Sequence, residues 1–534
     1  MGLWFLFLGL CIGVLVRCIH TLYRNYVSAR KTGLRFIVSP ITPYTVAWQV
    51  ATALLRPVLV KFRWFRAIDW TCAWQDGNSL HEELGSCFIV VSPGLNVLCS
   101  SDSRTIVNVL RRWREFVKPD NVNEIIGLFG QNVDTSNGDD WPRHRKLTAP
   151  CFSERASTSV WNEARHQTSA LVTQWLSAPN HKINTLFADT GTLALNVVSA
   201  IAFENHQTTQ PAKGHSLSLH DALTTIMGSS LAPALEALPH WLKSEKFLPK
   251  QVTHVIAATG EFSTYMDALI SRERTKPAAA SDAKLNLIGT LIRASGEKDG
   301  EMNARLSDEE VRGNVFNFII GGLEPTAIAL SYALALLAVH GDVQEWVLEE
   351  IDEVLGEGGD SYKDVYPRLK RCLAVMYETL RLFAPSPPPP RSFATPSSPH
   401  EIPTSSPTHP SLTLPPNTQI MLNPWSTHAS ASHFSSPSTW DPRRWLDASG
   451  NLVHSAGFFA WGSGPRICPG MKFSQVQFCA VLAGVLARVQ LVVGPQEKEG
   501  ILGVLMDSGA EPLVLKVRRP GELWVGVEER VRGA

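Results

Sequence analysis

The chain has 534 residues, nine cysteines and equal numbers of acidic and basic side chains, so its formal net charge at pH 7 is zero. A neutral balance argues against a nucleic acid partner, because domains that bind nucleic acids usually carry an excess of basic residues. Nine scattered cysteines, an odd number, do not make a disulfide framework and place the body of the protein in a reducing compartment.

The N-terminus predicts a membrane anchor. Residues 2–16 carry no charge, and Arg17 can snorkel so that the apolar run extends further. The basic residues that follow place the body of the protein in the cytosol by the positive-inside rule. A cleaved secretory signal is the alternative, but its basic start normally precedes the apolar core. We expect 1–22 to be a transmembrane signal anchor and 23–75 to be a membrane-proximal linker, in which 48–70 forms an amphipathic segment.

A basic helix is predicted to begin near residue 140. Asp140 suits the N-cap, and Pro142 falls in the first turn, where its missing N–H is tolerated. Trp141 and Arg145 are four residues apart and therefore share one face of this helix.

A long helix with an apolar pattern is predicted from a capping box formed by Ser307 and Glu310 to about His340. Its length would be roughly 50 Å at 1.5 Å per residue. The centre of this helix reads Gly-Gly-Leu-Glu-Pro-Thr at 321–326. Pro325 removes a backbone donor inside the helix and predicts a kink.

Helical periodicity dominates from 104 to about 382, and short strand-like runs occur outside that region. Glu378 and Arg381 are three residues apart on a predicted helix, where their charges can pair. The strand-like runs are 87–91, 97–99, 418–422 and 513–517.

The segment from 384 to 416 contains 12 of the chain's 35 prolines and many serines and threonines. Such a composition favours extended loops over helix or packed sheet. We expect 392–414 to be a Pro/Ser-rich loop inserted into the main domain, which spans 76–534.

The most informative segment is the glycine- and proline-rich loop 461–470, which surrounds Cys468. A helical pattern follows it directly. A sulfur at a helix N-terminus meets unpaired N–H groups, which favour the thiolate. A lone thiolate with open space above it suits the axial position of haem iron. A buried structural cysteine in a turn is the alternative.

This loop resembles the haem-binding motif of the cytochrome P450 family, Phe-x-x-Gly-x-Arg-x-Cys-x-Gly. Gly464, Arg466, Cys468 and Gly470 match it, and Trp461 stands in place of the usual phenylalanine. The resemblance extends over nearly the whole chain. It implies a mainly α protein with a single large catalytic fold and a small β region, preceded by an N-terminal anchor helix.

The resemblance also implies roles for individual residues. Cys468 would bind the iron of haem b, and Glu378, Arg381 and Arg444 would form a structural cluster that braces the cysteine loop. The residues matching those that bind the haem propionates are Trp141, Arg145, Arg391 and Arg466.

The centre of the long helix resembles the oxygen-activating segment of the family. Gly321 and Gly322 are expected to leave room there for dioxygen and a substrate carbon. The family's first threonine is replaced by Pro325, so we assign proton delivery to Glu324 and Thr326. A bond from Thr326 to its own helix is an equally good interpretation.

The implied function is insertion of one oxygen atom of O2 into a small lipophilic organic substrate, such as a terpenoid or a polyketide. Electrons would come from NADPH through a separate flavoprotein reductase, with cytochrome b5 as a further partner. The resemblance is to microsomal, fungal-like members, which implies a single-pass protein of the endoplasmic reticulum membrane. A basic face around Arg143, Lys146 and Lys472 is a candidate docking surface for the reductase.

Two other functions remain open from the sequence. One is a haem-thiolate isomerase or dehydratase without net oxygen insertion, which the replacement at Pro325 suggests. The other is a non-catalytic, haem-binding membrane protein.

Overall fold

The computed structural model describes residues 2–119, 126–204, 208–229, 232, 235, 248–275, 287–295, 305–356, 359–386, 389–395, 398–510 and 514–530. They divide into two compact units, each made of several chain segments. The smaller unit, 1–122 with 387–439 and 455–468, contains most of the β structure. The larger unit, 123–386 with 440–454 and 469–534, is mainly helical.

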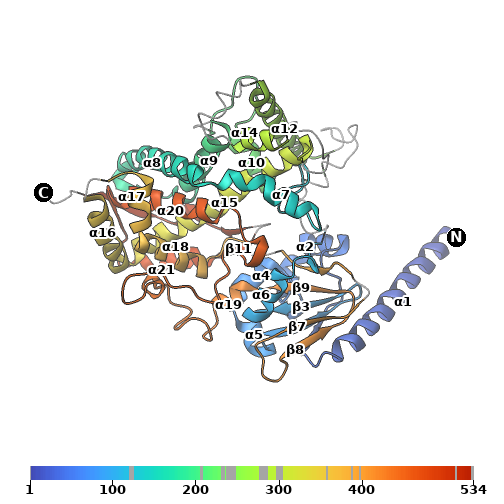
Figure 1. The fold of residues 1–534 in the computed structure, drawn as a ribbon. Coiled ribbons are helices and arrows are strands. Elements are labelled where there is room, and N and C mark those ends of the chain that lie inside the picture. The colour runs from blue at the N-terminus through green and yellow to red at the C-terminus, as the bar shows by residue number, and fades with distance from the viewer. Residues whose placement is uncertain are drawn as a thin grey trace. The chain divides into compact units, whose positions relative to one another are not determined.

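The sheet of the smaller unit joins strands that are far apart in sequence. Its order is β1-β2-β3-β9, in which β3 and β9 pair in parallel, and Figure 1 shows their arrows side by side. Every residue of β2 and β3 is buried because core clusters cover both faces of the sheet. The strand predictions for 87–91, 97–99 and 418–422 are therefore confirmed. The elements of this unit are α1 (Gly2–Arg30), β1 (Phe36–Val38), α2 (Val46–Leu59), α3 (Arg63–Arg66), α4 (Trp70–Asp76), α5 (Ser79–Leu84), β2 (Cys87–Val91), β3 (Asn96–Ser100), α6 (Ser103–Arg111), β4 (Phe116–Val117), β6 (Ser392–Phe393), β7 (His400–Pro403), β8 (Ser411–Leu414), β9 (Thr418–Leu422), α19 (Pro424–His428) and the short 3-10 helix η8 (Gly464–Arg466).

The Pro/Ser-rich segment contains a hairpin, so the prediction of a loop throughout 392–414 is wrong. Strands β7 and β8 pair in antiparallel fashion, with Ile402 opposite Leu412. These two side chains and Leu414 are buried in the core of the smaller unit. Alternate apolar residues thus overcome the loop-favouring composition, because burial on one face stabilises a strand whatever lies on the other.

The N-terminal helix α1 is continuous across the expected boundary at residue 22. Figure 1 shows it as one long helix, and its 29 residues span about 44 Å at 1.5 Å per residue. Leu22, Tyr26 and Ala29 pack against the core of the sheet. Its first part is different: the apolar side chains Phe5 and Leu10 are 71% and 67% exposed.

The larger unit is organised around α15, which starts at Asp308 and ends at Val339. The capping box of Ser307 and Glu310 is formed, so the predicted start is confirmed, and the helix continues through Pro325. Helices α9, α18 and α20 pack against it. Among the residues described, α15 is long and apolar enough to cross a membrane, but 83% of its apolar window is buried within the protein, as in a core helix.

The remaining elements of the larger unit are mostly helices, with two small sheets near the C-terminus. Strand β12 lies within the predicted run 513–517, whose first residue lies outside the described part of the chain. The elements are α7 (Asp140–Thr148), η2 (Ala149–Phe152), α8 (Glu154–Leu176), η3 (Pro179–His181), β5 (Lys182–Ile183), α9 (Leu186–Phe203), α10 (Leu219–Met227), α12 (Lys250–Thr275), α14 (Leu287–Ser295), α15 (Asp308–Val339), α16 (Gly341–Gly356), α17 (Tyr362–Val365), η6 (Tyr366–Arg368), α18 (Lys370–Leu382), η7 (Pro442–Trp445), α20 (Met471–Leu486), β10 (Val489–Val492), α21 (Lys498–Met506), β11 (Ser508–Ala510), β12 (Leu515–Val517), η9 (Pro520–Glu522) and β13 (Val525–Glu529).

Candidate functional site

The cysteine loop of the smaller unit has a fixed backbone. Gly462 and Gly464 have φ of 73° and 72°, in the left-handed region that glycine adopts without strain. A Cβ on Gly464 would also lie 2.9 Å from the carbonyl oxygen of Leu110. The amide of Cys468 donates a hydrogen bond to the carbonyl of Trp461 at 2.9 Å. The loop therefore closes on itself at the cysteine, and the Cys468 side chain is exposed.

Cys468 differs from the other cysteines of the protein body, all six of which are buried. Burial raises the pKa of the Cys87 thiol to about 11 and that of Cys151 to about 12. It also raises the pKa values of Cys99, Cys372 and Cys479. Buried thiols of this kind stay protonated and unreactive, whereas Cys468 is accessible to a metal centre.

Two predicted cations, Arg391 and Arg466, belong to the same unit as Cys468. The backbone of Arg391 forms both hydrogen bonds of an isolated bridge with Ile420, each 2.8 Å long. Its side chain is buried, and Nη1 donates to the carbonyl of Pro389 at 2.7 Å. The pairing with the sheet edge fixes where this arginine leaves the backbone. Arg466 lies in η8, within the cysteine loop itself.

Trp141 and Arg145 belong to the larger unit and lie on α7. This helix begins at Asp140, one residue later than its N-cap Asp139, so the prediction of Asp140 as N-cap is wrong. The Asp140 carboxylate instead pairs with Arg143 at 3.1 Å. Trp141 is buried, whereas Arg145 is partly exposed.

The motif at the centre of α15 also belongs to the larger unit. Glu324 forms an ion pair with Lys516 of β12, with 3.1 Å between Oε1 and Nζ. The carboxylate is largely buried and the lysine is 40% exposed, so the pair connects the middle of the core helix to solvent. Thr326 is buried, with 2% of its surface exposed.

The two glycines of this motif have different surroundings. A Cβ on Gly322 would lie 2.6 Å from Cγ2 of Val198, so Gly322 allows the close packing of α9 against α15. Nothing lies within 4 Å of the same position on Gly321. The prediction of open space is therefore wrong for Gly322 and remains an expectation for Gly321.

Glu378, Arg381 and Arg444 form one buried cluster in the larger unit. Arg381 donates Nε to Oε2 of Glu378 at 2.9 Å and Nη2 to Oε1 at 2.8 Å. Arg444 donates Nε to Oε1 at 3.1 Å. The indole N–H of Trp445 and the amide of Asp441 each add a hydrogen bond of 2.9 Å. Five donors thus compensate a fully buried carboxylate.

Sequence reasoning missed several of these partners. Lys516 belongs to no motif. Asp441 and Trp445 flank Arg444 in the segment 440–445, but their hydrogen bonds to Glu378 were not predicted, because they depend on the tertiary fold. The predicted docking surface also changes, because Arg143 pairs with Glu310 and is only 19% exposed. Lys146 is exposed, and Lys472 lies over the ring of Tyr366 at 4.2 Å.

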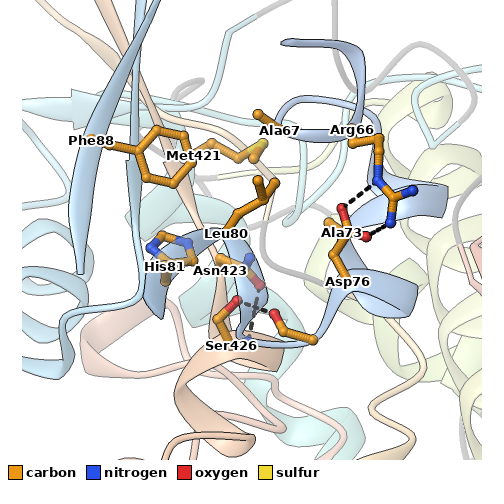
Figure 2. Close-up of a pocket in the computed structure, with 11 residues that line it drawn as sticks. Arg66, Ala67, Ala73, Asp76, Leu80, His81, Phe88, Met421, Asn423 and Ser426 are labelled. Atoms are coloured by element: carbon orange, nitrogen blue, oxygen red, sulfur yellow. Dashed lines mark hydrogen bonds and ion pairs between the residues drawn. The ribbon is translucent and has the colours of Figure 1, made fainter. Parts of the chain in front are cut away.

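A small pocket in the smaller unit is distinct from these residues. Figure 2 shows its polar wall, in which Arg66 pairs with Asp76 and the Ser426 hydroxyl donates to the carbonyl of Gly77. His81 also lines this pocket, and burial lowers its pKa to about 4. None of the haem-motif residues named above lines it.

A mainly helical fold, an exposed cysteine in a rigid loop and a buried Glu–Arg–Arg cluster define the class of haem-thiolate proteins. The chain belongs to the cytochrome P450 family, whose model matches residues 54–505. This confirms the predicted fold class. Membership implies haem with thiolate ligation and dependence on a redox partner.

Curated relatives and a solved structure agree with this assignment. "Cytochrome P450 monooxygenase ORF6" from Penicillium roqueforti is 29% identical over 87% of each chain. A "phomenoic acid biosynthesis cluster cytochrome P450 monooxygenase" from Leptosphaeria maculans is 26% identical over 89% of each. The retinoic acid bound cyanobacterial CYP120A1 superposes with a TM-score of 0.66 at 17% identity, covering 85% of this chain and 94% of that one. The protein is a monooxygenase, an oxidoreductase that incorporates oxygen from O2.

We expect Glu378→Gln to destabilise the protein by about 3–5 kcal/mol, because it leaves Arg381 buried without a countercharge. Arg443→Gln is the matched control. Arg443 precedes Arg444 in sequence, but its ion pair with Asp342 is exposed, so its loss should change stability by less than about 1 kcal/mol. Denaturant unfolding measures both variants, and equal effects would contradict a special role for the buried cluster.

Proposed function

We propose that Cys468 would hold the haem iron of this monooxygenase through its thiolate. The observation that carries the proposal is the exposed thiol at the end of a closed, glycine-dependent loop, immediately before α20. The donor set fits the group, because a thiolate is a strong ligand for iron and the cations expected nearby suit two propionates. Haem held in this way activates dioxygen for insertion of one oxygen atom into a substrate.

Four residues are assigned to the propionates of the haem. Trp141 offers an indole N–H from α7, and Arg145 offers a guanidinium one turn further along the same helix. Arg391 and Arg466 are assigned to the same task because they match the arginines of the family motifs. Arginine suits this task because its planar fork binds carboxylates through two parallel hydrogen bonds.

Glu324 is the residue we assign to proton delivery. Its carboxylate is near solvent through Lys516 and lies beside Pro325, which has no hydroxyl to offer. The carboxylate is assigned to relay protons through water. Thr326, two residues further along α15, provides a buried hydroxyl that we assign to the same task.

Glu324→Gln should lower the fraction of NADPH electrons that end in product by about tenfold or more, because the amide cannot carry the proton. The lost electrons should appear as hydrogen peroxide or water. Glu309→Gln makes the same change at an exposed position of the same helix and should leave the fraction unchanged. Product and peroxide per NADPH are measured with a reconstituted reductase, and equal values for the two variants would remove Glu324 from the pathway.

The substrate we propose is a lipophilic secondary metabolite, such as a terpenoid or a polyketide. Support comes from the fungal relatives, one of which is named for a biosynthesis cluster. Electrons would come from NADPH through a separate flavoprotein reductase, with cytochrome b5 as an additional donor. Lys146 and Lys472 remain on the surface of the larger unit as candidate contacts for an acidic partner.

The first part of α1 is proposed as a single-pass anchor in the endoplasmic reticulum membrane. Exposed apolar side chains along residues 5–19 support it, because water does not favour such a surface on a helix. Leu55 and Val58 on α2 and Phe62 just after it are also about half exposed, which suits contact with the same bilayer.

Deletion of residues 2–20 should move the protein from the membrane fraction to the soluble fraction, because the exposed apolar surface is removed. Cell fractionation with a carbonate wash measures this. Replacement of the same residues by an unrelated apolar anchor should restore membrane attachment, and an unchanged distribution of the deletion variant would contradict the anchor.

The central test of the function is a carbon monoxide difference spectrum of the reduced protein. The wild type should show the Soret band of a thiolate-ligated haem, and Cys468→Ala should lose it completely. Cys479→Ala is the matched control, since Cys479 lies on the following helix but is buried. Retention of the band in Cys468→Ala would assign the ligand to another residue.

A further inference from the structure

His144 lies on α7 between Arg143 and Arg145, and its side chain is fully buried. Its ring bridges α7 and the first turns of α15. Nε2 lies 3.1 Å from Oε1 of Glu310, and Nδ1 lies 3.0 Å from Nδ2 of Asn314. Each ring nitrogen therefore has its own partner on the neighbouring helix.

The carboxylate of Glu310 accepts the hydrogen bonds that join α7 to the start of α15. It receives the amide of Ser307 at 2.8 Å, as part of the capping box, and the guanidinium of Arg143 at 3.0 Å through Nη1. The hydrogen bond from His144 adds a further donor. One carboxylate thus stabilises the start of α15 and binds two consecutive residues of α7.

The orientation of the Asn314 amide fixes the protonation of His144. Oδ1 of Asn314 accepts the backbone amide of Val133 at 2.9 Å, and Nδ2 donates to the carbonyl of Glu310 at 2.7 Å. The amide cannot be flipped without losing both bonds, so an N–H group of Asn314 faces His144. Nδ1 of the ring must then be an acceptor without hydrogen. His144 is neutral, with its single hydrogen on Nε2, where it donates to Glu310.

The loop before α7 is held on the same turns of α15. A Cβ on Gly130, which has φ of 128°, would lie 2.3 Å from the carbonyl oxygen of Glu309. A Cβ on Gly313 would lie 2.4 Å from the carbonyl oxygen of Gly130. Because the backbones touch here, small displacements of the start of α15 must be transmitted to the loop and to α7.

We propose that His144 is a positioning residue whose neutral ring locks α7, with Trp141 and Arg145, onto the start of α15 and so determines how tightly haem is retained. This inference rests on the proposed haem site, because it assigns to α7 the binding of a propionate. It extends that proposal to side chains that are not themselves assigned to the haem.

Low pH should weaken the contact of His144 on α7 with Glu310 and Asn314 on α15. Burial lowers the pKa of His144, with the Glu310 carboxylate opposing and Arg143 adding to the shift. A histidine with a lowered pKa in the folded state costs stability as the pH falls below its ordinary value of 6.5, because only the unfolded chain takes up the proton readily. Burial alone would raise the pKa of Glu310, but hydrogen bonds from Arg143 and Ser307 have the larger effect and lower this pKa to about 2. The stability that the ionised Glu310 contributes is therefore lost only as the pH falls below 4.5, its ordinary value. Other charged groups on the elements packed together here are Asp140, Arg145 and Lys146 on α7, Asp308, Glu309 and Arg312 at the start of α15, Arg305 just before it, Asp134 in the loop and Arg293 on α14.

The first experiment measures the rate at which the full-length holoprotein loses haem to a haem-free globin at neutral pH. His144→Leu keeps much of the volume but leaves Glu310 and Asn314 each without one partner, so the rate should rise roughly tenfold. His144→Gln offers one acceptor and one donor to the same two groups and should restore most of the retention. Thr148→Val is the matched control, because among the described residues this buried hydroxyl of α7 donates to an acceptor of its own helix, the backbone carbonyl of Arg145 at 3.4 Å.

The second experiment follows the same rate between pH 7 and pH 5. Haem loss from the wild type should accelerate as the pH falls below 6.5, and His144→Gln should lose this acceleration because its amide does not titrate. Should His144→Leu fail to fold, this comparison decides alone. An identical acid response in the wild type and His144→Gln, or a rate for His144→Leu equal to that of Thr148→Val, would overturn the inference.

The two proposals fail in different ways. A wild-type protein that shows no thiolate-type haem spectrum contradicts the haem site itself. A wild type with that spectrum, in which the His144 variants release haem at the wild-type rate, contradicts only the role proposed for His144.

Discussion

The buried carboxylate of Glu378 is the interaction on which the larger unit depends. Five hydrogen bonds from three side chains and one backbone amide converge on it, and two of them come from one guanidinium. A charge at zero exposure is tolerated only with such complete compensation. The cluster ties α18 to the segment 440–445, and α18 in turn packs against α15 and α20.

The cysteine loop is connected to this arrangement at both of its ends. It follows the segment 440–454, which Glu378 holds through Arg444 and Trp445, and it leads directly into α20. Both attachments belong to the larger unit, while the loop itself folds with the smaller one. Its own glycines then fix the backbone around Cys468. The backbone around Cys468 is therefore constrained by its local conformation, and the segment 440–445 that precedes the loop is constrained by the buried cluster.

Local signals in the sequence were enough to predict what is local in the structure. The capping box at Ser307 follows from two side chains three residues apart, and the strands at 87–91 and 418–422 follow from short apolar runs. The pairing of Glu378 with Arg381 follows from helical spacing. The hairpin β7–β8 was missed because prolines and serines outnumber the three apolar residues that decide its fold.

What depends on the tertiary fold could not be predicted from the sequence. Gly322 has no side chain because Val198 of α9 occupies the space that a Cβ would need. No pattern in the sequence connects α9 with the motif on α15. Lys516 has no motif around it, yet it pairs with Glu324. The partners of His144 on α15 lie far along the chain, and only the fixed amide of Asn314 reveals that the ring is neutral. Distant polar pairs of this kind leave no periodic trace, because each needs just one suitable residue at one position.

X-ray absorption at the iron edge of the purified full-length protein tests the central claim most directly. A single sulfur scatterer in the first coordination shell, together with the nitrogens of a porphyrin, is the predicted result. A shell of nitrogen and oxygen alone, or a protein without iron, would contradict it.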